Sequence, residues 1–157
     1  MNRNLSLRIV VDADACPVKS EIAAVGRQFN VPVWLVSSYD HLLKAEEGVS
    51  IIHVDRSDQS ADLYIANHIV RGDVVLTQDY GLATLALSKS CHVLSFRGKI
   101  YNNENIDFLL DRRFIQAKAR RNGKHTKGPK PFTIDDRTFF QQQLTKLLHC
   151  LQENVHF

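Results

Sequence analysis

The sequence predicts an α/β protein in which helices cover both faces of a mostly parallel sheet of about five strands. Short apolar runs typical of buried strands alternate, over residues 7–96, with longer stretches whose apolar residues recur at helical spacing. Because crossover connections between parallel strands are right-handed, the carboxyl ends of these strands should meet at one edge of the sheet. The chain has 157 residues, which suits a single domain over residues 1–157 with one sizeable core.

The core of this domain is expected at about residues 5–96. Its strands are runs rich in Val, Ile and Leu, as buried parallel strands are, at residues 7–11, 31–36, 51–54, 73–77 and 92–94. Helices are expected at residues 18–29, 60–71 and 80–89, with a further short helix at 39–47. Pro17 fits the first turn of the first helix, and Ser60 is the expected cap of the helix that Gly72 ends.

The remaining residues, about 97–157, are expected to form a helical extension of the same domain. Residues 96–101 predict a small hairpin around Gly98, and residues 103–121 predict a helix with a strongly basic last turn. Residues 122–131 have the composition of a linker, and a final helix begins near Phe132 with Thr133 or Asp135 as its cap. We expect this C-terminal helix to be an arm that packs on the main body, or on a second copy in a homodimer.

The composition is that of an ordinary globular protein, with 44% hydrophobic and 24% charged residues. No apolar run reaches the roughly 18 residues needed to span a membrane. The first residues lack the shape of a signal peptide, so a cytoplasmic location is expected. The three cysteines are far apart, which argues against a disulfide framework or a zinc knuckle.

The charge of the chain is distributed unevenly. Residues 1–96 hold eight basic and eleven acidic residues, a net of −3, whereas residues 97–130 hold ten basic and three acidic residues, a net of +7. An acidic site beside a basic segment suits a protein that binds a cation and a nucleic-acid backbone together. We therefore expect a nucleic-acid partner, either RNA or single-stranded nucleic acid.

Four aspartates are the candidate catalytic and metal-binding residues. Asp12 and Asp14 follow the first strand, Asp79 follows the fourth, and Asp62 lies in the first turn of a helix. If they converge at the carboxyl edge, where open α/β sheets bind ligands, their mutual repulsion calls for Mg²⁺ or Mn²⁺, which prefer oxygen ligands. Asp14, Asp62 and Asp79 each have an alternative explanation as helix caps or helix-dipole residues, but capping does not explain Asp12.

Other residues near this edge are candidates for binding substrate. The Thr77 hydroxyl could orient a carboxylate, and Arg97 could either clamp a phosphate or pair with one of the aspartates. The basic residues expected along the mouth of the site are Arg97, Lys99, Arg120, Arg121, Lys124 and Lys127. Cys16 has two readings, a nucleophile or a small buried apolar residue.

Several motifs together resemble those of the bacterial YaiI/YqxD family. They are Val-Asp-Ala-Asp-Ala-Cys-Pro over residues 11–17, Ser-Ala-Asp over 60–62, Gly-Asp-Val-Val-Leu-Thr-Gln-Asp-Tyr-Gly-Leu-Ala over 72–83, Arg-Gly-Lys-Ile-Tyr over 97–101 and Gly-Pro-Lys-Pro-Phe over 128–132. The order of the acids also resembles the PIN-like nuclease superfamily, although many of its members carry Glu where this chain has Asp62. This resemblance implies a PIN-like three-layer α/β/α fold with a C-terminal helical arm.

The function expected from these observations is divalent-metal-dependent hydrolysis of phosphodiesters in RNA or single-stranded nucleic acid. Two alternatives remain open on the sequence. Asp12 and Asp14 also resemble the nucleophile and general acid of a haloacid-dehalogenase-type phosphatase, and a protein that binds nucleic acid without cleaving it would show the same charge pattern.

Overall fold

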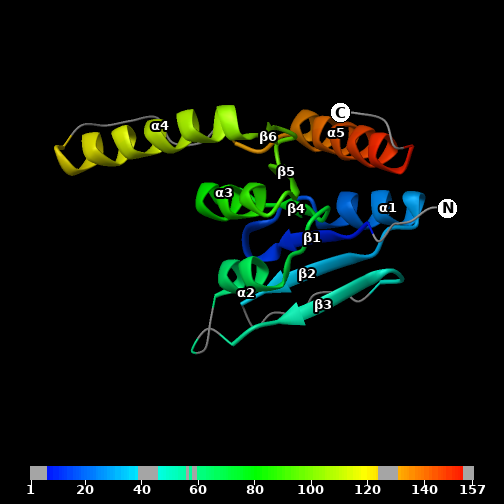
Figure 1. Cartoon of the computed structure of the whole chain (residues 1–157). Coiled ribbons are helices and arrows are strands. Elements are labelled where there is room, and N and C mark those ends of the chain that lie inside the picture. The colour runs from blue at the N-terminus through cyan, green and yellow to red at the C-terminus, as the bar shows by residue number, and fades with distance from the viewer. Residues whose placement is uncertain (1–6, 39–45, 56, 58–59, 124–130, 154–157) are drawn as a thin grey trace.

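The computed structural model of the chain describes residues 7–38, 46–55, 57, 60–123 and 131–153 (Figure 1). Its strands are β1 (Ile9–Asp12), β2 (Val33–Ser37), β3 (Val49–His53), β4 (Val74–Leu76), β5 (His92–Leu94) and β6 (Ile100–Tyr101). Its helices are the 3-10 turn η1 (Ala13–Ala15) and α1 (Lys19–Phe29), α2 (Ala61–His68), α3 (Tyr80–Ser88), α4 (Asn103–Arg121) and α5 (Ile134–Gln152). The predicted short helix at 39–47 lies mostly outside the described residues, as does most of the predicted linker at 122–131.

The sheet has the strand order β3-β2-β1-β4-β5-β6, in which every neighbouring pair is parallel except β5 and β6. The chain moves outward from β1 through β2 to β3, and then crosses to β4 on the other side of β1. The direction of winding therefore reverses between β1 and β4. In open α/β sheets, ligands bind in the crevice outside the carboxyl ends of the strands at such a reversal.

Helices cover both faces of the sheet, which confirms the predicted α/β/α layers. On one face, α1 and α5 bury Ile22, Phe140 and Leu144 against alternate strand residues such as Val11 and Leu76. The other face is covered by α2, α3 and the start of α4, which contribute the buried residues Ala61, Ile65, Leu82, Ala83, Ala86, Ile106 and Leu109. The central strands β1 and β4 are thus buried on both sides, as strands of parallel sheets are, whereas the edge strand β3 has no buried residue.

The predicted hairpin around Gly98 is present as the antiparallel pair β5 and β6. Gly98 adopts φ 85°, a left-handed conformation that favours glycine. A Cβ at this position would lie 2.7 Å from the Phe139 ring of α5. The hairpin and α5 therefore approach each other too closely for any larger residue at Gly98.

The C-terminal helix packs on the main body of its own chain. Its cap is Thr133, whose hydroxyl accepts a hydrogen bond from the Asp136 N–H, in a capping box with that residue. Four of its side chains are buried in the core, namely Phe140, Leu144, Leu147 and Leu148. Of the two expectations for this helix, packing on the body is the one that the fold bears out.

The helix that does project is α4. Ile106 and Leu109 bury its first turns against the body, but none of the described side chains from Arg112 to Arg121 is buried. Figure 1 shows α4 extending past the other elements on the side to which the arrowheads of β1, β2 and β3 point. Its basic end therefore lies on the same side of the molecule as the carboxyl edge of the sheet.

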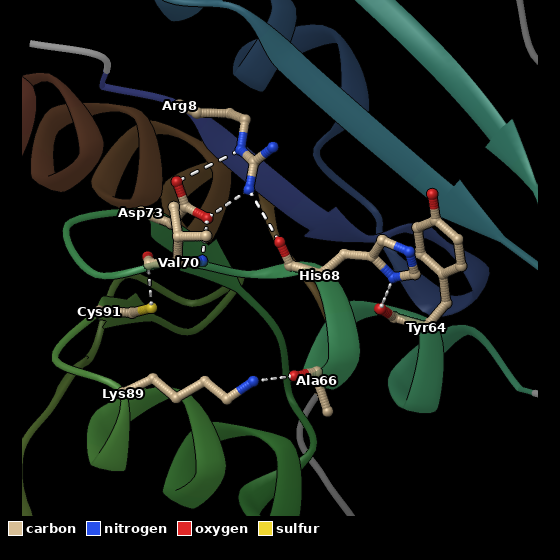
Figure 2. A network of polar contacts seen from close by, with 8 residues as sticks. All are labelled: Arg8, Tyr64, Ala66, His68, Val70, Asp73, Lys89 and Cys91. Carbon is tan, nitrogen blue, oxygen red and sulfur yellow. Dashed lines mark hydrogen bonds and ion pairs between the residues drawn. The ribbon is translucent and has the colours of Figure 1, made fainter.

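The amino edge of the sheet is held by a polar cluster around Asp73 (Figure 2). Arg8, just before β1, donates to both carboxylate oxygens of Asp73, through Nη2 at 2.6 Å and Nε at 3.3 Å. The Val70 N–H donates to the same carboxylate at 2.9 Å, and Arg8 also donates to the His68 carbonyl at 3.2 Å. Asp73 directly precedes β4 and therefore lies at the amino edge of the sheet, opposite the edge of the four candidate aspartates.

The helix α2 is shorter than predicted. It ends at His68 because Ile69 is extended and the chain then turns through Gly72 into β4. Ser60 occupies the N-cap position, but its hydroxyl makes no capping bond and donates instead to the Asp62 carboxylate. Ser60 is therefore the N-cap residue of α2, as predicted, although its side chain bonds to Asp62 and not to the backbone of the first turn.

Candidate functional site at the strand reversal

Asp12 and Asp79 lie at the ends of the two strands between which the winding reverses. Asp12 is the last residue of β1, and Asp79 follows the carboxyl end of β4 by three residues. The two strands are parallel neighbours, with Val11 opposite Leu76. The expected convergence of distant acids at one edge of the sheet is therefore present for this pair.

A buried threonine connects the two aspartates. The Thr77 hydroxyl donates to Asp12 Oδ2 at 3.1 Å and accepts a hydrogen bond from the Asp79 N–H at 3.0 Å. Thr77 has no exposed surface, so its hydroxyl is held by packing in this bridging position. This arrangement supports the orienting role predicted for Thr77.

The other three candidate aspartates all act on the ionisation of Asp12. Burial is the largest cause that raises the pKa of Asp12 from 3.8 to about 6, and the negative charges of Asp14, Asp79 and Asp62 act in the same direction. The hydrogen bond from Thr77 acts in the opposite direction. Asp12 is thus a desolvated carboxylate in a field of like charges, which is an arrangement that a bound cation would relieve.

Asp14 is held by the end of the neighbouring strand β2. Its carboxylate accepts hydrogen bonds from the Ser37 hydroxyl at 2.8 Å, the Ser38 N–H at 2.8 Å and the Ser38 hydroxyl. These three donors fix the position of the Asp14 carboxylate, which lies within η1. Neither serine is among the residues predicted for the site, although both follow a predicted strand at the same edge.

Asp79 and Asp62 each have a local role as well. Asp79 caps α3, because its Oδ1 accepts hydrogen bonds from the Gly81 N–H at 2.8 Å and the Leu82 N–H at 3.1 Å. Asp62 lies in the first turn of α2 and accepts a hydrogen bond from Ser60. For these two residues, the capping or first-turn explanation is correct, and it does not exclude a second role for the other carboxylate oxygen.

The four aspartates do not form a closed cage. Across the described part of the chain, no group of three or more His, Cys, Asp or Glu side chains is arranged to hold a metal ion. The donor set nevertheless suits Mg²⁺ or Mn²⁺, since Mg²⁺ is commonly held by one or two carboxylates together with waters and substrate phosphates. Asp12 fits such a site best, because its charge is both desolvated and repelled by its neighbours.

The predicted substrate-binding residues are distributed more widely. Arg97 donates to Asp136 of α5 at 3.0 Å and lies over the Phe132 ring, so it pairs with an aspartate outside the group of four. Lys99 is exposed in the β5–β6 hairpin, and Arg120 and Arg121 lie in the projecting end of α4. Lys124 and Lys127 lie outside the described residues.

Cys16 is not a candidate nucleophile. It is buried beside the aspartates, and burial raises the pKa of its thiol to about 11. The thiolate is the reactive form, so a thiol with this pKa is inert near neutral pH. The alternative reading, a small buried apolar residue, agrees with its place in the core under α1.

Comparison with known proteins places the chain in a family. The model of the family described as "Uncharacterized BCR, YaiI/YqxD family" matches residues 10–150, which include the whole site. The chain belongs to the YaiI/YqxD family. A UPF0178 protein of Bacillus cereus is 48% identical to it over 137 residues, covering 86% of this chain and 94% of the relative.

Further relatives of the YaiI/YqxD chain are equally similar. A UPF0178 protein of Bacillus thuringiensis subsp. konkukian is 48% identical over the same coverage, and one of Bacillus anthracis is 47% identical. No solved structure matches the chain significantly. Among the described helices of the YaiI/YqxD protein, none combines the length and apolar character needed to cross a membrane.

The role of Thr77 can be tested on the protein alone. Thr77→Val removes the donor to Asp12 Oδ2 but keeps the branched shape, so the pKa of Asp12 should rise above its wild-type value. Carbon-13 NMR titration of the aspartate carboxyls would measure this change. Thr84→Val, which removes a hydroxyl bonded to the Tyr80 carbonyl in α3, is the matched control. An Asp12 pKa that is unchanged or lower in Thr77→Val would contradict the assigned hydrogen bond.

Proposed function

We propose that this YaiI/YqxD protein is a PIN-like, divalent-metal-dependent nuclease that hydrolyses phosphodiesters in RNA or single-stranded nucleic acid. The observation that carries the proposal is the position of Asp12 and Asp79 on either side of the strand reversal, with the buried Thr77 hydroxyl between them. This is the place where an open α/β sheet binds its ligand, and here it is lined with carboxylates.

In this proposal, Asp12 is the principal ligand of Mg²⁺ or Mn²⁺, and Asp14, Asp62 and Asp79 add negative charge and further oxygen ligands. The ion, when bound, supplies charge neutralisation at the phosphoryl oxygens of the substrate. Thr77 orients the Asp12 carboxylate, and Ser37 and Ser38 fix Asp14. No side chain among the described residues of the site is assigned as a separate general base.

The substrate backbone would be held by positive charge at the mouth of the site. Lys99 and the basic end of α4, with Arg120 and Arg121, lie on exposed elements, and α4 projects on the carboxyl side of the sheet (Figure 1). Such contacts bind phosphate with little base preference, and their affinity falls as salt rises. Lys124 and Lys127 continue this basic run in the sequence and are proposed for the same role.

The phosphatase alternative receives less support. A general acid needs a carboxyl oxygen that can donate a proton to the leaving group, but both oxygens of Asp14 are already engaged as acceptors of hydrogen bonds from Ser37 and Ser38. The non-catalytic alternative, a protein that binds nucleic acid without cleaving it, is a defined outcome of the following test.

Cleavage of labelled RNA and single-stranded DNA by the purified protein should require Mn²⁺ or Mg²⁺. Asp12→Asn keeps the shape of the side chain and its hydrogen bond from Thr77, but it should lower cleavage by at least about a hundredfold, because the principal ion ligand loses its charge. The exposed Asp135→Asn in α5 is the control and should cleave like wild type.

Three outcomes would count against this function. Cleavage that Asp12→Asn does not reduce would assign the activity to a contaminant or to another site. A phosphorylated intermediate at Asp12 would favour the phosphatase. Salt-dependent binding of RNA that survives chelation, with no turnover under any divalent ion, would identify a binding protein instead.

A further inference from the structure

The outward face of α4 carries large apolar side chains that no part of the described chain covers. Phe108 is 65% exposed and Ile115 is 64% exposed, and they are seven residues apart, which places them on one stripe of the helix. Ile106 and Leu109, which bury α4 against the body, lie on the other side. Phe114 is similarly exposed beside the stripe. A soluble helix normally turns its polar side outward, so this face is suited to a partner.

The charges of α4 are divided between its two halves. The first half holds only acidic charges, at Glu104, Asp107 and Asp111, and the second half holds only basic charges, which include Arg112, Lys118, Arg120 and Arg121. This polarity agrees with the helix dipole, which favours acids at the amino end and bases at the carboxyl end. The dipole, however, does not explain the apolar stripe that runs between the charges.

The acids of α4 have no basic neighbour on their own face of the helix. Residues three or four positions apart face each other on a helix, and none of the three acids has a lysine or arginine at such a distance. The charge pattern thus lacks the internal ion pairs that normally support a solvated helix. It is instead complementary to an identical helix that runs in the opposite direction.

We propose that α4 forms an antiparallel, two-fold symmetric contact with α4 of a second copy of this chain. Phe108 of one copy then packs near Ile115 of the other, and the acidic half of each helix faces the basic half of its partner. A contact of this kind is self-complementary, as two-fold dimers require. The expected homodimer therefore uses α4, because α5 buries its main apolar side chains, including Phe140 and Leu144, within its own chain.

This contact is compatible with the proposed binding of nucleic acid. Arg120 follows Leu109 by eleven residues, or about three helical turns, so it continues the face of α4 that is directed toward the body. The apolar stripe is directed away from that face. The dimer contact and the binding of nucleic acid therefore use different sides of α4, and either can be wrong without the other.

Sedimentation of the full-length protein over about 1–100 µM should show a monomer–dimer equilibrium. Phe108→Ser with Ile115→Ser should raise the dimer dissociation constant by at least about thirtyfold, because each substitution occurs twice in the interface. Leu63→Ser, at an exposed apolar residue of α2, is the matched control and should dimerise like wild type.

Exchange of charges provides a second test that leaves the apolar residues intact. One double variant, Glu104→Lys with Asp111→Lys, gives both halves of α4 a net positive charge. The other, Arg112→Glu with Lys118→Glu, reverses two positive charges in the second half of the helix. Each double variant should be largely monomeric alone at 100 µM, whereas an equal mixture of the two should form a heterodimer.

A wild-type protein that stays monomeric at 100 µM would overturn the proposal. So would a dimer that the charge-exchanged variants form as well as wild type does, because the contact would then lie elsewhere. Circular dichroism of each variant establishes that it is folded, and recovery of dimer in the mixture cannot arise from misfolding.

Discussion

Replacing Arg8 with methionine should lower the free energy of unfolding by about 3 kcal/mol, because it leaves a buried carboxylate without its cation. The Asp73 side chain is 1% exposed and the Arg8 side chain is 19% exposed, so water screens this ion pair little. Arg8 also lies over the Trp34 ring, with its Cζ 4.0 Å from the ring centroid. Figure 2 shows its further hydrogen bond to the His68 carbonyl. For a domain of this size the expected fall in Tm is roughly 6–12 °C.

Thermal and urea unfolding would measure this loss, and an exposed ion pair offers the control. Arg27 and Glu46 are bonded at 3.0 Å with side chains that are 47% and 41% exposed, so Arg27→Met should cost less than about 1 kcal/mol. Adding Asp73→Asn to Arg8→Met should recover part of the loss, since the amide needs no cation and can still accept from Val70. An equal loss in the free energy of unfolding for Arg8→Met and Arg27→Met would show that the buried Arg8–Asp73 pair stabilises the fold no more than the exposed Arg27–Glu46 pair does.

Neutralising Asp12 should have the opposite effect and stabilise the protein at neutral pH. Because the pKa of Asp12 is raised from 3.8 to about 6 on folding, the native state binds this proton more tightly than the unfolded state does. The contribution of Asp12 to stability is therefore fully present below about pH 4 and is lost as the pH rises through about 6, above which its cost is constant. A shift of this size corresponds to on the order of 2–3 kcal/mol, which Asp12→Asn should restore above pH 7 and not at pH 4.

Unfolding curves at several pH values, with and without Mn²⁺, would test this prediction. At pH 7.5, Mn²⁺ should raise the Tm of wild type and should do so much less for Asp12→Asn, because the variant has lost the charge that binds the ion. Asp135→Asn should respond to Mn²⁺ as wild type does. If Asp12→Asn is no more stable than wild type at pH 7.5, ionisation of Asp12 does not destabilise the folded protein, and the prediction is wrong.

The elements that could be predicted from the sequence are those whose signals are local. The apolar runs placed the strands to within about two residues, and the Gly98 turn and the Asn103–Arg121 helix were predicted as observed. The convergence of Asp12 with Asp79 also followed from the sequence, because strands joined by helical crossovers run parallel and so bring their carboxyl ends to one edge of the sheet.

Contacts between residues far apart in the chain could not be predicted in this way. The pairing of Asp14 with Ser37 and Ser38 depends on which strand lies beside β1, and that of Arg97 with Asp136 depends on where α5 docks. The exposure of Phe108 and Phe114 on α4 likewise depends on how that helix docks on the body.

The docking of α5 has a consequence for how the chain folds during its synthesis. The apolar face formed by β1, β4 and α1 is completed by Phe140, Leu144 and Leu148, which emerge from the ribosome after all six described strands. Until then, a nascent chain of about 130 residues presents an uncovered, sheet-forming surface to other chains and to chaperones. The apolar face of the sheet is therefore protected from aggregation only after α5 has been synthesised and has docked on it.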